Sequence, residues 1–185
     1  MRSVSTVFKS AILVFLSAVA SFDAAAETPT ISELLDQLSN PETENWRELE
    51  DKIWREWSRS GSPAMDLLLK RGRDAMEAED AEAAIEHFTA LIDHAPDFAE
   101  AWNARAEAYY KSQKMGPALE DLRHTLALNP QHFGALTGLA VILRELDQKA
   151  LSLEAYKASE AIHPHRANVR EAIEQLEKEL GGSTL

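Results

Sequence analysis

The sequence contains no cysteine among its 185 residues, which excludes disulfides, thiolate chemistry and cysteine-ligated zinc sites. It also has no segment in which apolar and polar residues alternate, the pattern typical of a half-buried strand. A glycine-rich phosphate loop, a metal-ligand spacing and a nucleophile with a neighbouring base are likewise missing. These absences favour an all-α protein without catalytic activity, and we expect neither a cofactor nor a metal ion.

Basic residues are scarce in this chain. It carries 19 Lys and Arg against 31 Asp and Glu, for a formal net charge of −12. Contacts with nucleic-acid phosphates and with anionic membrane surfaces are made by Lys and Arg, so an acidic chain is repelled by both. We therefore expect a protein or peptide partner and no nucleic acid.

A single long apolar run is present, and it lies near the N-terminus. Arg2 and Lys9 precede an apolar stretch from Ser10 to Phe22, and small residues follow up to Ala26. This order is typical of a cleavable secretory signal over residues 1–26. An uncleaved membrane anchor is the alternative, but a spanning helix needs about 20 apolar residues, more than this run supplies. We expect export to the periplasm and no stable membrane insertion after cleavage.

Prolines recur at a fixed interval in the central part of the chain. Pro96, Pro130 and Pro164 are each separated by 34 residues, and other columns keep the same period. A period in this range indicates stacked supersecondary units. The other columns are Leu68, Trp102 and Leu136; Gly72, Ala106 and Ala140; Ala84, Ala118 and Ser152; and Phe88, Leu122 and Tyr156.

This pattern of large and small positions with a closing proline resembles the tetratricopeptide repeat (TPR) family. The resemblance implies a right-handed solenoid of antiparallel helix pairs, with three units in residues 63–164 (about 65–98, 99–132 and 133–164). Arg71 and Arg105 depart from the pattern, which favours Leu there, and the turns inside the three pairs lack the usual Gly. The chain as a whole looks like the small exported TPR proteins of Gram-negative bacteria.

Helical patterns also flank the repeats. In residues 27–62, Thr30 and Glu33 form a capping-box signal, and a second helix brings Trp46, Trp54 and Trp57 onto one apolar face. The repeat register makes this pair a degenerate leading repeat that acts as an N-terminal cap. Its three Trp leave open a second interpretation, self-association or docking. Residues 165–185 are expected to form a C-terminal capping helix with a tail.

The resemblance also implies a binding surface. In TPR proteins the first helix of each pair lines a concave groove, and we expect Arg73 and Arg144 to pair with ligand carboxylates and Asn103 to bond a peptide backbone. Gly134 and Gly138 fall on the same side, where close approach by a bound segment or a neighbouring hairpin explains them. The nominated groove residues are Leu69, Arg73, Met76, Asn103, Glu107, Tyr110, Thr137, Val141 and Arg144.

Histidines are the remaining candidates for chemistry. His163 and His165 flank Pro164 near Glu160, but residues on either side of a proline in an extended turn point apart, so we expect ordinary surface histidines. The sequence therefore predicts a non-enzymatic adaptor of the bacterial envelope that binds a peptide or helix in its groove. An accessory enzyme of envelope metabolism is a weaker alternative.

Overall fold

The computed structural model describes residues 29–182, and this part of the chain contains nine α-helices and no strand. The predicted all-α fold is confirmed, whereas the signal predicted for residues 1–26 lies outside the described residues. No described helix combines the length and the apolar character needed to cross a bilayer. The helices are α1 (Ile31–Leu38), α2 (Trp46–Trp57), α3 (Pro63–Glu77), α4 (Ala81–His94), α5 (Ala99–Lys111), α6 (Met115–Leu128), α7 (Phe133–Glu145), α8 (Lys149–Ile162) and α9 (Ala167–Gly182).

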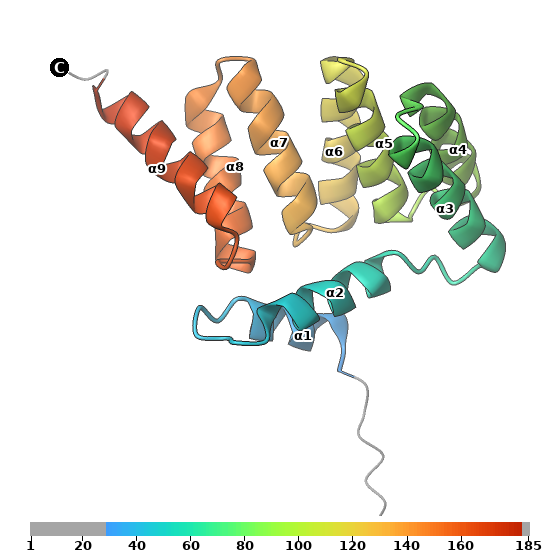
Figure 1. The fold of residues 1–185 in the computed structure, drawn as a ribbon, viewed down its shortest axis with the longest axis horizontal. Helices are drawn as coiled ribbons and strands as arrows, with labels where there is room; N and C mark the ends of the chain where they lie inside the picture. The colour runs from blue at the N-terminus through green and yellow to red at the C-terminus, as the bar shows by residue number, and fades with distance from the viewer. Residues whose placement is uncertain (1–28, 183–185) are drawn as a thin grey trace, which may run out of the picture.

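Helices α3 to α9 form one row of antiparallel neighbours (Figure 1). Each repeat unit supplies one pair: α3 with α4, α5 with α6, and α7 with α8. Helix α9 packs on α8 at the end of the row and buries Val169, Ile173 and Leu176 there. The last helix therefore covers the apolar side of the third pair, as a terminal cap must.

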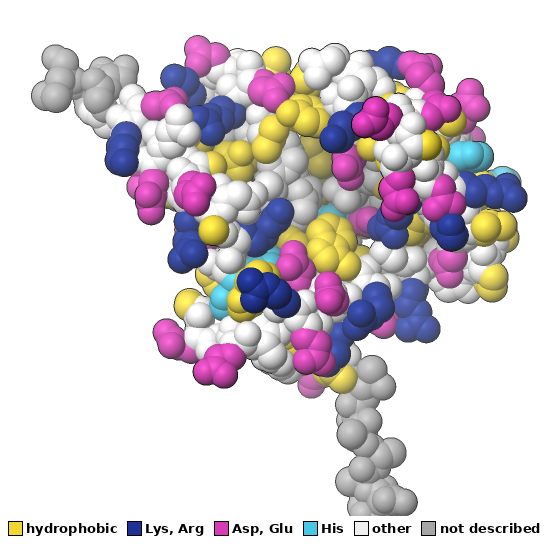
Figure 2. Space-filling model, viewed as in Figure 1, with side chains coloured by type: hydrophobic (Ala, Val, Ile, Leu, Met, Phe, Trp, Pro, Cys, Tyr) yellow, Lys and Arg dark blue, Asp and Glu magenta, His cyan; other side chains and the backbone are white. Residues whose placement is uncertain are grey.

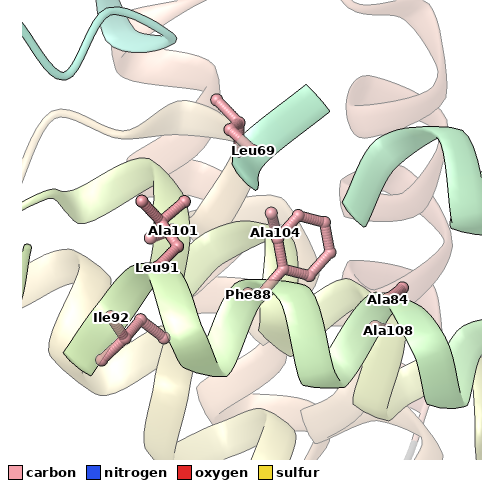
Figure 3. Packing of buried hydrophobic residues seen from close by; sticks show 8 residues of the cluster. All are labelled: Leu69, Ala84, Phe88, Leu91, Ile92, Ala101, Ala104 and Ala108. Carbon is pink, nitrogen blue, oxygen red and sulfur yellow. The ribbon is translucent and has the colours of Figure 1, made fainter. Parts of the chain in front are cut away.

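Small residues set the spacing within the first pair. A β-carbon at Gly72 of α3 would lie 2.2 Å from a ring carbon of Phe88, so the aromatic ring occupies the space that only glycine leaves free. Phe88 also reaches α5, where Ala104 and Ala108 belong to the same buried cluster (Figure 3). Because Phe88 joins two neighbouring pairs, neither pair buries its apolar face alone.

The turns inside the three pairs share an unusual backbone. Glu79, Gln113 and Asp147 have φ angles of 59°, 59° and 57°, and they are separated by the same 34 residues as the prolines. This left-handed conformation normally favours glycine after a helix, and any other residue adopts it at a cost. The turns thus keep the geometry of the repeat without the residue that suits it best.

Arg105, which replaces an expected Leu, forms an ion pair with α6. Its guanidinium donates two hydrogen bonds to the carboxylate of Asp121, at 2.7 and 2.9 Å, and a third to Thr89 in α4 at 3.0 Å. Asp121 is buried. The departure from the repeat pattern is therefore compensated by a bidentate contact that links α4, α5 and α6.

The N-terminal pair does not stack on α3 as a leading repeat. The capping box of Thr30 and Glu33 forms as predicted, but α1 and α2 cross the lower ends of the repeat helices (Figure 1). Their apolar side chains pack with Phe133 of α7 and Ile162 of α8. An amphipathic helix covers whichever apolar surface it can reach, and Phe133 supplies one far from α3 in the row.

Candidate functional site

Two adjoining cavities lie on the side of the molecule formed by the first helix of each pair. The larger has a volume of about 350 Å³ and is lined mainly by α5 and α7; the smaller has about 310 Å³ and is lined by α3 and α5. Trp54, Asn103 and Glu107 line both. We call the two cavities together the groove. Figure 2 shows this face hollowed above α2, with hydrophobic and charged side chains around the hollow.

Seven of the nine nominated residues line the groove. Leu69 and Arg144 do not. Leu69 is 2% exposed and belongs to the core between α3, α4 and α5, so it is packing material and not a ligand contact. Arg144 pairs with Glu179 of α9 at 3.6 Å. The residues at the larger cavity are Asn103, Glu107, Tyr110, Thr137 and Val141, and those at the smaller one are Arg73, Met76, Asn103 and Glu107.

Arg73 lines the smaller cavity but already has a carboxylate partner. Its guanidinium lies 2.5 Å from one oxygen of Glu100, and the other oxygen lies 3.0 Å from Nε2 of His132. Nδ1 of His132 accepts the backbone N–H of Ala135, so Nε2 carries the proton and donates to Glu100. Glu100 and His132 are buried. Arg73 therefore serves first to neutralise a buried carboxylate that joins α3, α5 and α7.

Tyr110 is held at the far side of the larger cavity. Its hydroxyl donates a hydrogen bond of 2.5 Å to Glu145 at the end of α7. This hydrogen bond raises the pKa of the Tyr110 hydroxyl, and partial burial and the negative charge of Glu145 add to the effect. The hydroxyl thus remains protonated, and the ring keeps a fixed orientation beside Val141.

Trp54 is a groove residue that the sequence did not nominate. It belongs to α2 and lies against the backbone of α7, where a β-carbon at Gly134 would stand 2.7 Å from its indole Cη2. The close approach expected at Gly134 is therefore made by a segment of the same chain, while Gly138 faces Leu122 of the preceding hairpin. The signals for Trp54 were the glycine in α7 and the apolar face of α2, but they did not connect the two.

The other Trp residues of the N-terminal pair also pack within the chain. Trp57 stacks on His132 with ring centroids 4.4 Å apart, and Trp46 stacks on His165 at 5.5 Å. Both belong to the cluster around Phe133. The apolar face that left self-association open is thus used against α7 and the segment before α9.

Arg166 is the second groove residue that was missed. It lies in the turn before α9, lines the larger cavity and donates a hydrogen bond of 3.1 Å to the hydroxyl of Thr137. Its guanidinium is half-buried and forms no ion pair within residues 29–182. Burial lowers the pKa of the guanidinium, although Glu50 partly opposes this from a longer distance. No repeat column covers position 166, so the period could not have pointed to it.

Two of the histidines expected at the surface are buried. His132 belongs to the Glu100 network, and His163 packs between Trp46 and Phe133. Neither ring nitrogen of His163 has a hydrogen-bond partner, and Glu50 lies 3.4 Å away. The apolar surroundings of α2 cause the difference, because they cover the Pro164 turn. Within the described residues no group of three His, Asp or Glu side chains is arranged to hold a metal ion.

Comparison with known sequences gives the family. A tetratricopeptide repeat family model matches residues 69–123. A TPR repeat-containing protein of Rhizobium etli is 32% identical over 133 residues, which are 72% of this chain and 65% of that protein. The chain thus spans less than two thirds of the length of this relative. A BBSome complex member of Drosophila melanogaster is 27% identical over 92 residues, which are 50% of this chain and 19% of that protein.

Solved structures agree in fold. The first TPR domain of Spaghetti (RPAP3), determined with an HSP90 peptide, has a TM-score of 0.61 at 19% identity and covers 63% of this chain and 93% of its own. MamA has a TM-score of 0.61 at 19% identity and covers 75% and 81%. At such identities the likeness concerns the fold alone. Together with the repeat model and the Rhizobium relative, it shows that the chain belongs to the tetratricopeptide-repeat family.

Proposed function

We propose that this protein is a non-enzymatic interaction module that binds a segment of another protein in the groove. The observation that carries the proposal is the junction of the two cavities, which share Trp54, Asn103 and Glu107 and so form one continuous surface across three helix pairs. A surface that combines an apolar floor with a few polar groups is typical of binding sites.

The chemistry of the groove suits an extended segment. Leu122 and Val141 provide apolar walls in the larger cavity, and the amide of Asn103 can both donate to and accept from a peptide backbone. Each cavity has room for a few side chains, and α2 stands across one end of the groove, so an extended ligand fits better than a whole helix. TPR domains of RPAP3, solved with HSP90 and HSP70 peptides, support this mode of binding.

A peptide array tests the proposal. Wild-type protein residues 27–185 should retain a defined subset of random 12-residue peptides, and Val141→Glu should lose them because the new carboxylate enters the apolar wall. Leu151→Glu is the matched control, since Leu151 is 50% exposed on α8 and lies outside the groove. Equal retention by all three proteins, or no retention by the wild type, would exclude the groove as a peptide site.

The setting is a separate part of the proposal. The signal pattern in residues 1–26 supports export, and an exported interaction module is suited to an adaptor role in a bacterial envelope. Mass spectrometry of the protein purified from periplasmic extracts should give a mature chain that begins at Glu27. A cytosolic protein that retains Met1 would contradict the envelope setting and leave the groove untouched.

A further inference from the structure

The two ends of the groove differ in charge. The larger cavity is lined by two cations, Arg166 and Lys111, and neither forms an ion pair with another described residue. The smaller cavity is lined by Glu77, Glu100 and Glu107, and its single cation, Arg73, is already paired with Glu100. One end of the groove therefore has unbalanced positive charge and the other unbalanced negative charge.

Arg166 is the strongest element of this asymmetry. Its guanidinium has lost part of its hydration, and its one hydrogen bond goes to a neutral hydroxyl, that of Thr137. A desolvated cation without a carboxylate is costly, and the cost falls when an anion reaches it. The lowered pKa of the Arg166 guanidinium reflects the same loss of hydration. A guanidinium in this state offers planar, bidentate geometry to a carboxylate.

We propose that the groove selects its ligand by charge order. The larger cavity takes a carboxylate at Arg166 together with an apolar side chain against Val141 and Trp54, and the smaller cavity takes a Lys or Arg side chain between Glu77 and Glu107. The inference rests on the proposed function and adds the chemical class and direction of the bound segment. Electrostatic complementarity of this kind fixes the register of a ligand more than it adds affinity.

A carboxylate can come from two sources. An Asp or Glu side chain inside a longer segment and the C-terminal carboxylate of a chain present the same chemistry to Arg166. The probe is therefore a set of 12-residue peptides that contain one Glu and one Lys at varied positions, each made with a free and with an amidated C-terminus. Loss of binding on amidation identifies a chain end, and retention identifies a side chain.

The expected result is a preference for one order of Glu and Lys along the peptide. Arg166→Met should weaken binding of the preferred peptides about 10-fold, the size of one lost charge-assisted hydrogen bond, and remove the selection for Glu. Arg170→Met is the matched control, because Arg170 is exposed in α9 and lines neither cavity. Arg166→Glu should shift the preference from Glu to Lys.

The wild-type array separates this inference from the proposed function and does not depend on any variant folding. Peptides retained without a preference for charge order would overturn the inference and leave groove binding intact. Retained selection for Glu in Arg166→Met, with an unchanged circular dichroism spectrum, would also overturn it. If no peptide is retained, both the groove function and the charge order are excluded.

Discussion

Trp54 of α2 lies directly against Gly134 of α7, with its indole Cη2 2.7 Å from the place that a β-carbon at position 134 would occupy. This contact joins the N-terminal pair to the repeats and at the same time forms one wall of the groove. Docking of α2 and the shape of the binding surface are therefore parts of one arrangement.

Gly134→Ala should loosen the N-terminal pair. The added methyl group cannot fit beside the indole, and overpacking of this kind costs about 1 to 3 kcal/mol, more than the helix propensity that Ala returns. Gly138→Ala is the control, since a β-carbon there would meet Leu122 at an ordinary 3.5 Å. Red-shifted Trp fluorescence should appear in Gly134→Ala alone. The same emission in both variants would contradict the close contact.

Asp121→Asn should be strongly destabilising, because it leaves the guanidinium of Arg105 without its charge partner. Removal of one member of a buried ion pair costs about 3 to 5 kcal/mol. The double variant Arg105→Leu with Asp121→Ala should recover part of that loss, since it leaves no unpaired charge. Urea unfolding of the three proteins measures both effects. A double variant less stable than Asp121→Asn would show that the pair itself stabilises the fold.

Docking of the N-terminal pair should weaken in mild acid. Burial lowers the pKa of His163 below its ordinary 6.5, with Arg166 and His165 acting in the same direction and Glu50 against it. The undocked state therefore takes up the proton at a higher pH than the docked state. Docking is strongest above pH 6.5 and declines as pH falls through the lowered pKa of His163.

Trp emission between pH 8 and pH 5 measures this decline, because Trp46 packs on His163. The expected result is a red shift that begins below pH 6.5 and is reduced in His163→Gln, which keeps a polar side chain of similar size but does not titrate. An identical pH profile in the two proteins would assign the transition to other groups.

Gln113→Gly should stabilise the second repeat. The left-handed backbone at this position costs a residue with a β-carbon about 1 to 2 kcal/mol, and glycine gives back part of the gain through its larger entropy in the unfolded chain. Ser112→Gly, with a φ of −83°, should instead destabilise the protein. Thermal unfolding compares the two. A lower Tm for Gln113→Gly than for wild type would contradict the assignment of strain to this turn.

The row of helix pairs was predictable because its information is local and periodic. A spacing of 34 residues fixes where Gly72 meets Phe88, and the same columns place Asn103, Thr137 and Val141 on one side. The position of α2 was not predictable in this way. Its apolar face shows that the helix is buried, but a face alone does not say that Phe133 and Gly134 receive it.

The charges of the groove were the harder part. Arg73 and Arg144 were expected to await a ligand, yet Glu100 and Glu179 occupy them. These partners lie 27 and 35 residues away, on other helices, so only the folded arrangement brings them together. Arg166 remains without a carboxylate because it lies in a turn where no repeat column supplies one.

Hydrogen–deuterium exchange of the protein with an array-selected peptide tests the central claim, binding in the groove, most directly. The expected result is slower amide exchange in α5 and α7 and in α2 around Trp54, with no change in α4 and α6. Protection confined to α4, α6 or α8, or no protection at a saturating peptide concentration, would show that the groove is not the binding surface.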